Sequence, residues 1–121
     1  MASNLSLPSV FDLSRINDQW GSQEDDIYRA VLRIFADEGQ TLCAEMRLSL
    51  TEGRLDMLAR AAHTLKAAAA NVGASRLSEC AGAIEAAAES SKRDGLKALL
   101  VRVETAWRAV RAELDRSGSQ T

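Results

Sequence analysis

The chain has 121 residues, which is enough for one domain with a single hydrophobic core. Hydrophobic residues make up 46% of it and aromatic residues only 4%, and its abundant alanine favours helices over strands. The net charge is −2 with both signs interspersed, so nothing suggests a nucleic-acid partner. No stretch approaches the roughly 20 apolar residues that span a bilayer, and residues 1–9 lack a secretory signal. We therefore expect a cytoplasmic protein with no membrane partner.

The cysteine and histidine content argues against several classes of enzyme. Cys43 and Cys80 are far apart in the sequence, unlike the pair of a zinc or redox motif, and we interpret both as small core residues in a reducing compartment. A hydrolase or metalloenzyme would need more ligands, or a base–nucleophile pair, than one histidine and two distant cysteines supply. The absence of a glycine-rich phosphate loop argues against an ATP-dependent kinase. We expect no metal and no cofactor of the chain's own.

Turn and capping residues separate the predicted helices. Asp12 can cap a short first helix, which Gly21 ends. Ser22 begins an N-terminal signature for the second helix, which ends near residues 51–53. Gly39 in its interior costs about 1 kcal/mol relative to alanine and allows a bend. The apolar residues of this helix are Ile27, Val31, Ile34, Phe35, Leu42 and Met46.

Three further helices are predicted. The third covers residues 54–72 and stops at Gly73. We expect Ser75 to cap the fourth helix, and either Asp94 or the serines at 90–91 to open the fifth. The apolar residues of the last two helices are Leu77, Cys80, Ala81, Ile84, Ala87 and Ala88, followed by Leu96, Leu99, Leu100, Val103, Trp107, Val110 and Leu114.

Short connections between long amphipathic helices imply that neighbours in sequence run antiparallel. The sequence therefore predicts an all-α fold, an antiparallel up-down-up-down four-helix bundle with an additional short N-terminal helix. We place the domain at residues 10–116, between a flexible N-terminus at residues 1–9 and a flexible C-terminal tail at residues 117–121.

The third predicted helix carries the only histidine of the chain, His63. At about 100° per residue, His63 points away from the apolar stripe of this helix. That stripe comprises Leu55, Leu58, Ala61, Ala62, Leu65, Ala68, Ala69 and Val72, whereas the neighbours of His63 are Asp56, Ala59, Lys66, Ala67 and Ala70. An accessible imidazole among mostly short side chains, with a lysine one turn away, is a candidate nucleophile.

Glu85 is the candidate partner of this histidine. The turn at Gly73–Ala74 folds the third and fourth helices together, and His63 and Glu85 are equally far from Ala74, each about 16 Å along its helix. A carboxylate that binds Nδ1–H would fix the tautomer and leave Nε2 free. If the imidazole takes up a phosphoryl group, the ammonium of Lys66 could contact the oxygens of that group. Two alternatives for Glu85 stay open, since it could instead pair with Lys66 or face water.

This pattern resembles the histidine-containing phosphotransfer (HPt) domains of two-component phosphorelays. The family has a five-helix fold and an Ala-His-x-Leu-Lys-Gly-small-small-x-x-x-Gly-Ala signature on the phosphorylated helix. The matching residues here are Ala62, His63, Leu65, Lys66, Ala68, Ala69, Gly73 and Ala74. The resemblance covers nearly the whole chain, from Asp12 to Leu114.

The resemblance implies a phosphoryl carrier rather than an enzyme. A receiver domain of a hybrid histidine kinase, with Mg²⁺ bound to the receiver, would transfer a phosphoryl group from its aspartate to Nε2 of His63. The aspartate of a response regulator would then accept it. The implied docking surface comprises Leu13, Ile16, Ala59, Ala67 and Ala70. A carrier that buries its core within one chain is expected to be a monomer.

Two departures from the family pattern and one rival function remain. Ala67 stands where the family most often has glycine, and its methyl group narrows the approach of a partner. Glu85 stands where many members have glutamine, and resembles the variant of chemotaxis-kinase phosphotransfer domains. The rival is a helical adaptor that binds signalling partners without being phosphorylated. We interpret Trp20 and Trp107 as packing residues. We interpret Arg102, Arg108 and Arg111 as the solvated face of the last helix.

Overall fold

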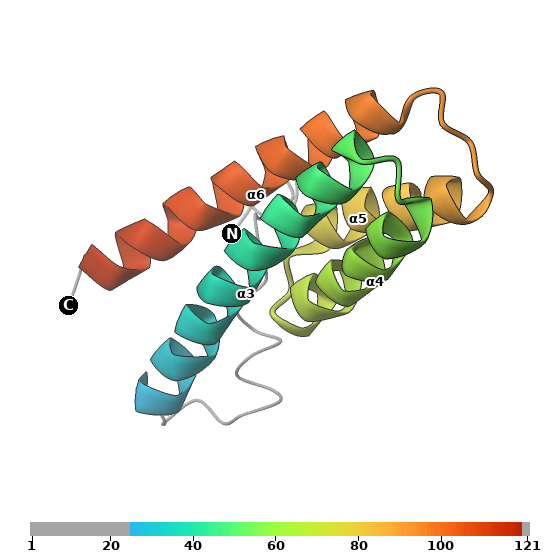
Figure 1. Ribbon diagram of the computed structural model, residues 1–121. Coiled ribbons are helices and arrows are strands. Elements are labelled where there is room, and N and C mark those ends of the chain that lie inside the picture. The colour runs from blue at the N-terminus through green and yellow to red at the C-terminus, as the bar shows by residue number, and fades with distance from the viewer. Residues whose placement is uncertain (1–24, 120–121) are drawn as a thin grey trace.

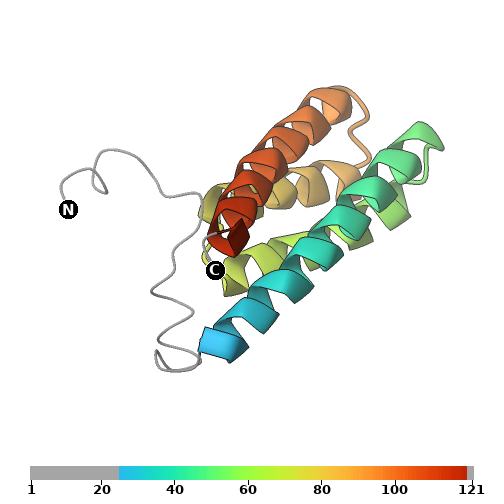
Figure 2. The same ribbon diagram turned by 90° about the vertical axis from the view of Figure 1, so that its left-hand side faces the viewer.

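The computed structural model describes residues 25–119, and within them the chain is all-α. Its four described helices are α3 (Asp25–Thr51), α4 (Leu55–Asn71), α5 (Ser75–Glu89) and α6 (Leu96–Ser119) (Figure 1). Each helix packs against the next along the chain, and α3 also packs against α6, which closes the bundle. Figure 2 shows α3 and α6 running in opposite directions across the α4–α5 pair. The predicted antiparallel four-helix bundle is therefore confirmed, whereas the predicted first helix at residues 12–21 lies outside the described residues.

Positive backbone dihedrals at glycine mark the connections on either side of α4. The dihedral φ is 72° at Gly53 and 78° at Gly73, a conformation that glycine adopts without steric cost. At the end of α4, the N–H of Gly73 donates to the carbonyl of Ala70 and that of Ala74 to the carbonyl of Ala69. These two bonds satisfy carbonyls that the helix end would otherwise leave unpaired. The prediction that Gly73 stops this helix is confirmed.

The predicted starts of the last two helices are wrong. Ser75 is the first residue of α5 rather than its cap, because Ala74 occupies the cap position and no side chain bonds there. The serines at 90–91 end α5 instead of opening the next helix, since Ser90 is its C-cap and Ser91 has φ of 57°. Helix α6 begins at Leu96 and not at Asp94, and continues to Ser119, into the segment that we expected to be a flexible tail.

The core lies between the four helices and contains the apolar residues predicted for α4, α5 and α6. On α3 the buried residues include Leu32, Phe35, Gly39, Leu42 and Met46, which recur every three or four positions. Ile34 lies outside this stripe and is 65% exposed, although it is one of the apolar residues of the helix. Ile27 is also exposed. Within the described residues, no helix is both long and apolar enough to cross a bilayer.

The two cysteines are free thiols. Cys43 is buried in the core, as predicted, whereas Cys80 is only half-buried. Burial, followed by the nearby charge of Glu104, raises the pKa of the Cys43 thiol to about 11. This thiol is therefore protonated and unreactive at neutral pH.

Trp107 on α6 packs into the bundle against α3, as predicted. Its ring meets Phe35 edge-on, with centroids 5.6 Å apart. Gly39 makes room for this ring, because a Cβ atom built on Gly39 would lie 2.4 Å from Trp107 Cη2. The helix-interior glycine, which we expected to allow a bend, thus serves the packing of an indole.

We predict that Gly39→Ala lowers the free energy of unfolding by about 1–3 kcal/mol, because the added methyl overpacks the core. This loss outweighs the gain in helix propensity of about 1 kcal/mol. Urea denaturation measures the change, and Gly39→Ala combined with Trp107→Phe, which trims the ring, should lose less than the two single changes added together. A stabilised Gly39→Ala protein would contradict the packing.

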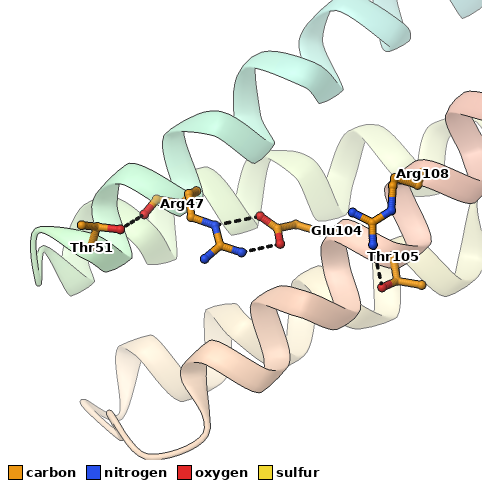
Figure 3. A network of polar contacts seen from close by, with 5 residues as sticks. All are labelled: Arg47, Thr51, Glu104, Thr105 and Arg108. Atoms are coloured by element: carbon orange, nitrogen blue, oxygen red, sulfur yellow. Dashed lines mark hydrogen bonds and ion pairs between the residues drawn. The ribbon is translucent and has the colours of Figure 1, made fainter.

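A surface ion pair also joins α3 to α6. The Nε atom of Arg47 donates to Glu104 Oε2 at 3.0 Å, and Arg47 Nη2 pairs with Glu104 Oε1 (Figure 3). Arg108 bonds Thr105 on the same helix and is exposed, as expected for the solvated face of α6. Exposed pairs of this kind contribute about 0.2–1 kcal/mol, so the core rather than this network determines the stability of the bundle.

Candidate functional site

His63 projects from α4 on the side opposite the core. Leu58, Ala62, Leu65 and Ala69 are all fully buried on this helix. The side chain of His63, in contrast, is 62% exposed. The orientation predicted from helical periodicity is confirmed, so a partner protein can reach the imidazole ring.

Glu85 on α5 binds one nitrogen of this ring. His63 Nδ1 lies 2.8 Å from Glu85 Oε2, which is the contact expected from the equal distances of the two residues from the Gly73 turn. An ionised carboxylate can only accept hydrogen bonds, so Nδ1 carries the proton and donates it. In the neutral ring the unprotonated nitrogen is then Nε2, whose lone pair is available to an electrophile.

The same carboxylate also binds Lys66. Lys66 Nζ lies 2.8 Å from Glu85 Oε1, so the two oxygens of Glu85 serve the ammonium and the imidazole separately. The side chain of Glu85 is only 13% exposed, against 41% for Lys66. Of the alternatives left open for Glu85, pairing with His63 and pairing with Lys66 therefore hold together, and facing water does not.

These contacts keep Glu85 ionised. The hydrogen bond from Lys66 is the main cause that lowers the pKa of the Glu85 carboxyl from its ordinary value of 4.5, and the bond from His63 acts in the same direction. Partial burial opposes both. At neutral pH the site therefore holds a fixed negative charge that orients the ring and is compensated by one ammonium.

We predict a pH-dependent contribution of Glu85 to stability. Because its pKa is lower in the folded than in the unfolded chain, this contribution is fully present above the ordinary value of 4.5 and is lost as pH falls through the folded pKa. Wild type should exceed Glu85→Gln in unfolding free energy by about 1 kcal/mol or less at neutral pH. Urea titrations between acid and neutral pH measure the difference, with Glu79→Gln on the same helix as control. A difference that grows toward acid pH would contradict the assignment.

The predicted docking residues divide into three groups. Ala67 is exposed and Ala70 half-buried, so both offer small side chains beside the histidine. Ala59 is only 8% exposed and its methyl group belongs to the core cluster, so its predicted place on the docking surface is not what the structure shows. Leu13 and Ile16 lie outside the described residues and stay predictions.

Sequence reasoning missed two residues of α5 that contact Lys66. The hydroxyl of Ser78 donates to the backbone carbonyl of Lys66 at 2.9 Å. A Cβ atom built on Gly82 would lie 3.2 Å from Lys66 Cδ, so the alkyl chain of Lys66 passes close to this glycine. The signal that could have found Gly82 is its position inside an alanine-rich helix, where glycine weakens the helix and usually has a packing reason.

The described residues contain no cluster of three or more metal-binding side chains. What they hold together is an accessible nucleophilic nitrogen, a carboxylate that orients it and an ammonium that can meet an anion. Transfer of a phosphoryl group asks little more of a protein than positioning and neutralisation of charge.

Comparison with known proteins agrees with this geometry. The family model of the Hpt domain matches residues 30–119. Histidine-containing phosphotransfer protein B (HptB) from Pseudomonas aeruginosa PAO1 superposes with a TM-score of 0.85 at 19% identity, over 95% of this chain and 99% of that one. A candidate histidine-containing phosphotransfer protein from rice superposes with a TM-score of 0.75 at 20% identity, over 95% of this chain and 83% of that one. No curated protein matches the chain.

Proposed function

Since the chain belongs to the Hpt domain family, it is a histidine phosphotransfer protein of a phosphorelay, and we propose that His63 carries the phosphoryl group on Nε2. The observation that carries this assignment is the bond between His63 Nδ1 and Glu85. It leaves Nε2 as the unprotonated nitrogen of an exposed ring. His63 is also the only histidine of the chain.

The transfer step uses these residues together with a receiver domain and the Mg²⁺ bound to that receiver. Nε2 of His63 attacks the phosphorus of a receiver aspartyl phosphate, a P–N bond forms, and the P–O bond to the aspartate breaks. The proton stays on Nδ1, where Glu85 balances the positive charge that the ring acquires. Attack by the aspartate of a second receiver on the same phosphorus reverses these changes and restores the neutral ring.

Receiver domains are the partners of this family, and we assign two of them roles here. The donor is the receiver of a hybrid histidine kinase and the acceptor is a response regulator. The Mg²⁺ that transfer requires belongs to the receiver. In this scheme the chain is a monomeric carrier of the cytoplasm that is not itself an enzyme, and its domain is residues 10–116.

The direct test uses a receiver domain whose aspartate carries ³²P. Incubation with the protein should move label to it, as an acid-labile, base-stable phosphoramidate. Mass spectrometry at neutral or basic pH should place the phosphate on His63. Binding of the receiver without any transfer of label would instead support the adaptor function and refute the proposal.

We predict that Lys66→Ala slows phosphoryl transfer by roughly two- to tenfold, because the ammonium no longer meets phosphoryl oxygens with a charge-assisted bond. Rapid-quench measurements of label on His63 give the rate, and decay of the isolated phosphoprotein gives its lifetime. Lys97→Ala, on the exposed side of α6, is the matched control. Equal rates for both variants would leave Lys66 without a role in the chemistry.

A further inference from the structure

Lys66 is contacted along its whole length by one face of α5. Ser78 bonds its backbone carbonyl, Gly82 lies against its Cδ atom, and Glu85 binds its ammonium. These three residues of α5 are four and then three positions apart, so they form a single row along one face of that helix. The row runs in the direction in which the lysine side chain extends.

Ser78 fixes where the side chain begins. Its hydroxyl is partly buried and donates at 2.9 Å to a carbonyl that lies inside α4. A carbonyl oxygen has two lone pairs, so this bond adds to the helical one rather than replacing it. The contact therefore ties the register of α4 to that of α5 at Lys66 itself.

Gly82 leaves the space through which the side chain passes. A Cβ atom there would come within 3.2 Å of Lys66 Cδ, which is tighter than most Cβ contacts in proteins, so Cδ would have to move by a few tenths of an ångström. Lysine has a flexible alkyl chain, so an added methyl group would displace Cδ rather than break the helix. The displacement would be passed on to the ammonium, which lies 2.8 Å from Glu85.

We propose that Ser78 and Gly82 are positioning residues that hold the ammonium of Lys66 on Glu85, beside the ring that takes up phosphate. The proposal rests on the function assigned to His63 above. Its consequence is electrostatic: a bare Glu85 carboxylate next to a phosphorylated ring would repel the phosphoryl group. An ammonium already held on that carboxylate removes the repulsion and is close at hand when the phosphoryl group arrives.

The first test is a titration of the unphosphorylated protein, which is independent of any transfer activity. In Gly82→Ala the ammonium is displaced, so the pKa of Glu85, followed by the NMR shift of its carboxyl carbon, should rise toward that in Lys66→Ala. In Gly82→Ala/Lys66→Ala the added methyl has no lysine to displace, and the Glu85 titration should match that of Lys66→Ala alone. An unchanged Glu85 titration in Gly82→Ala would overturn the positioning role and leave the function of His63 intact.

The second test is the rate of transfer to His63. Gly82→Ala should slow transfer by up to about fivefold, the range expected when a partly exposed ion pair is lost, and should have no effect in the Lys66→Ala background. A further loss in that background would mean that Gly82 acts through the general structure of α5, which would overturn the proposal. If no label reaches the wild type or any variant, the assigned function is refuted instead.

Ser78 is tested by the presence or absence of its hydroxyl. Ser78→Ala should raise the pKa of Glu85 and slow transfer in the same direction as Gly82→Ala, and Ser78→Thr, which keeps the hydroxyl, should restore both. If Ser78→Ala lowers only the melting temperature and Glu85 titrates as in wild type, the hydroxyl contributes to packing and not to the position of Lys66.

Discussion

Replacing His63 with glutamine is expected to abolish phosphoryl transfer while leaving the stability of the bundle nearly unchanged. The loss of transfer is complete because the lone pair of an amide nitrogen is delocalised into the carbonyl and does not attack phosphorus, and the chain offers no second histidine. The loss of stability is small, below about 1 kcal/mol, because the side chain is 62% exposed and makes one surface contact. Glutamine can still donate a hydrogen bond to Glu85 through its amide.

Two measurements on the same variant separate chemistry from folding. Label transfer from a phosphorylated receiver reports the chemistry, and thermal unfolding by circular dichroism reports the fold. Binding of the receiver to His63→Gln should persist, since the docking surface around the ring is unchanged. Label on His63→Gln at the rate of wild type would place the phosphate on another residue, and a large fall in melting temperature would contradict the exposed position of the ring.

The helices were predictable because their periodicity and their stop signals are local. The end of α4 follows from Gly73, whose backbone lets the last carbonyls of the helix be paired. The starts of α5 and α6 were not predictable from capping preferences, although Ser75 and Asp94 are residue types that favour the cap. Which residue takes the cap position depends on the path of the preceding turn, and that path is set by the packing of whole helices.

The burial of single residues shows the same limit. Ile34 is as apolar as its neighbours but lies off the stripe that meets the core, because the direction of α3 is fixed by all its contacts together. Ala59 lies on the predicted side of α4, yet its methyl group is covered by the bundle. Periodicity gives the angle of a side chain around its helix, but it does not show whether neighbouring residues cover that side chain.

The pairing of His63 with Glu85 was predictable because a hairpin of two helices places residues equally far from the turn at the same height. The contact of Lys66 with the same carboxylate was left open, since the long side chain of lysine reaches several positions from one Cα atom. Only the structure shows the contacts of Gly82 and Ser78 with Lys66, from which we infer their positioning role. The roles of Leu13 and Ile16 in docking stay predictions.

Leu65→Ala is expected to have the opposite effect to that of His63→Gln, lowering the free energy of unfolding by about 2–5 kcal/mol. Leu65 is fully buried in the centre of the bundle, so its truncation loses apolar contacts and leaves a cavity. The matched control is Leu48→Ala, since Leu48 is 57% exposed and its truncation should change stability by about 0.5 kcal/mol or less. Urea denaturation of both variants measures the difference.

The two residues test one geometric statement, because Leu65 follows His63 by two positions and a helix turns by about 200° over that distance. If Leu65 faces the core, His63 must face outward, and the reverse also holds. Leu65→Ala should therefore be unstable yet transfer phosphate at temperatures where it stays folded, while His63→Gln should be stable and inactive. A nearly neutral Leu65→Ala would mean that α4 is rotated about its axis. The assignment of an exposed His63 ring would then also be wrong.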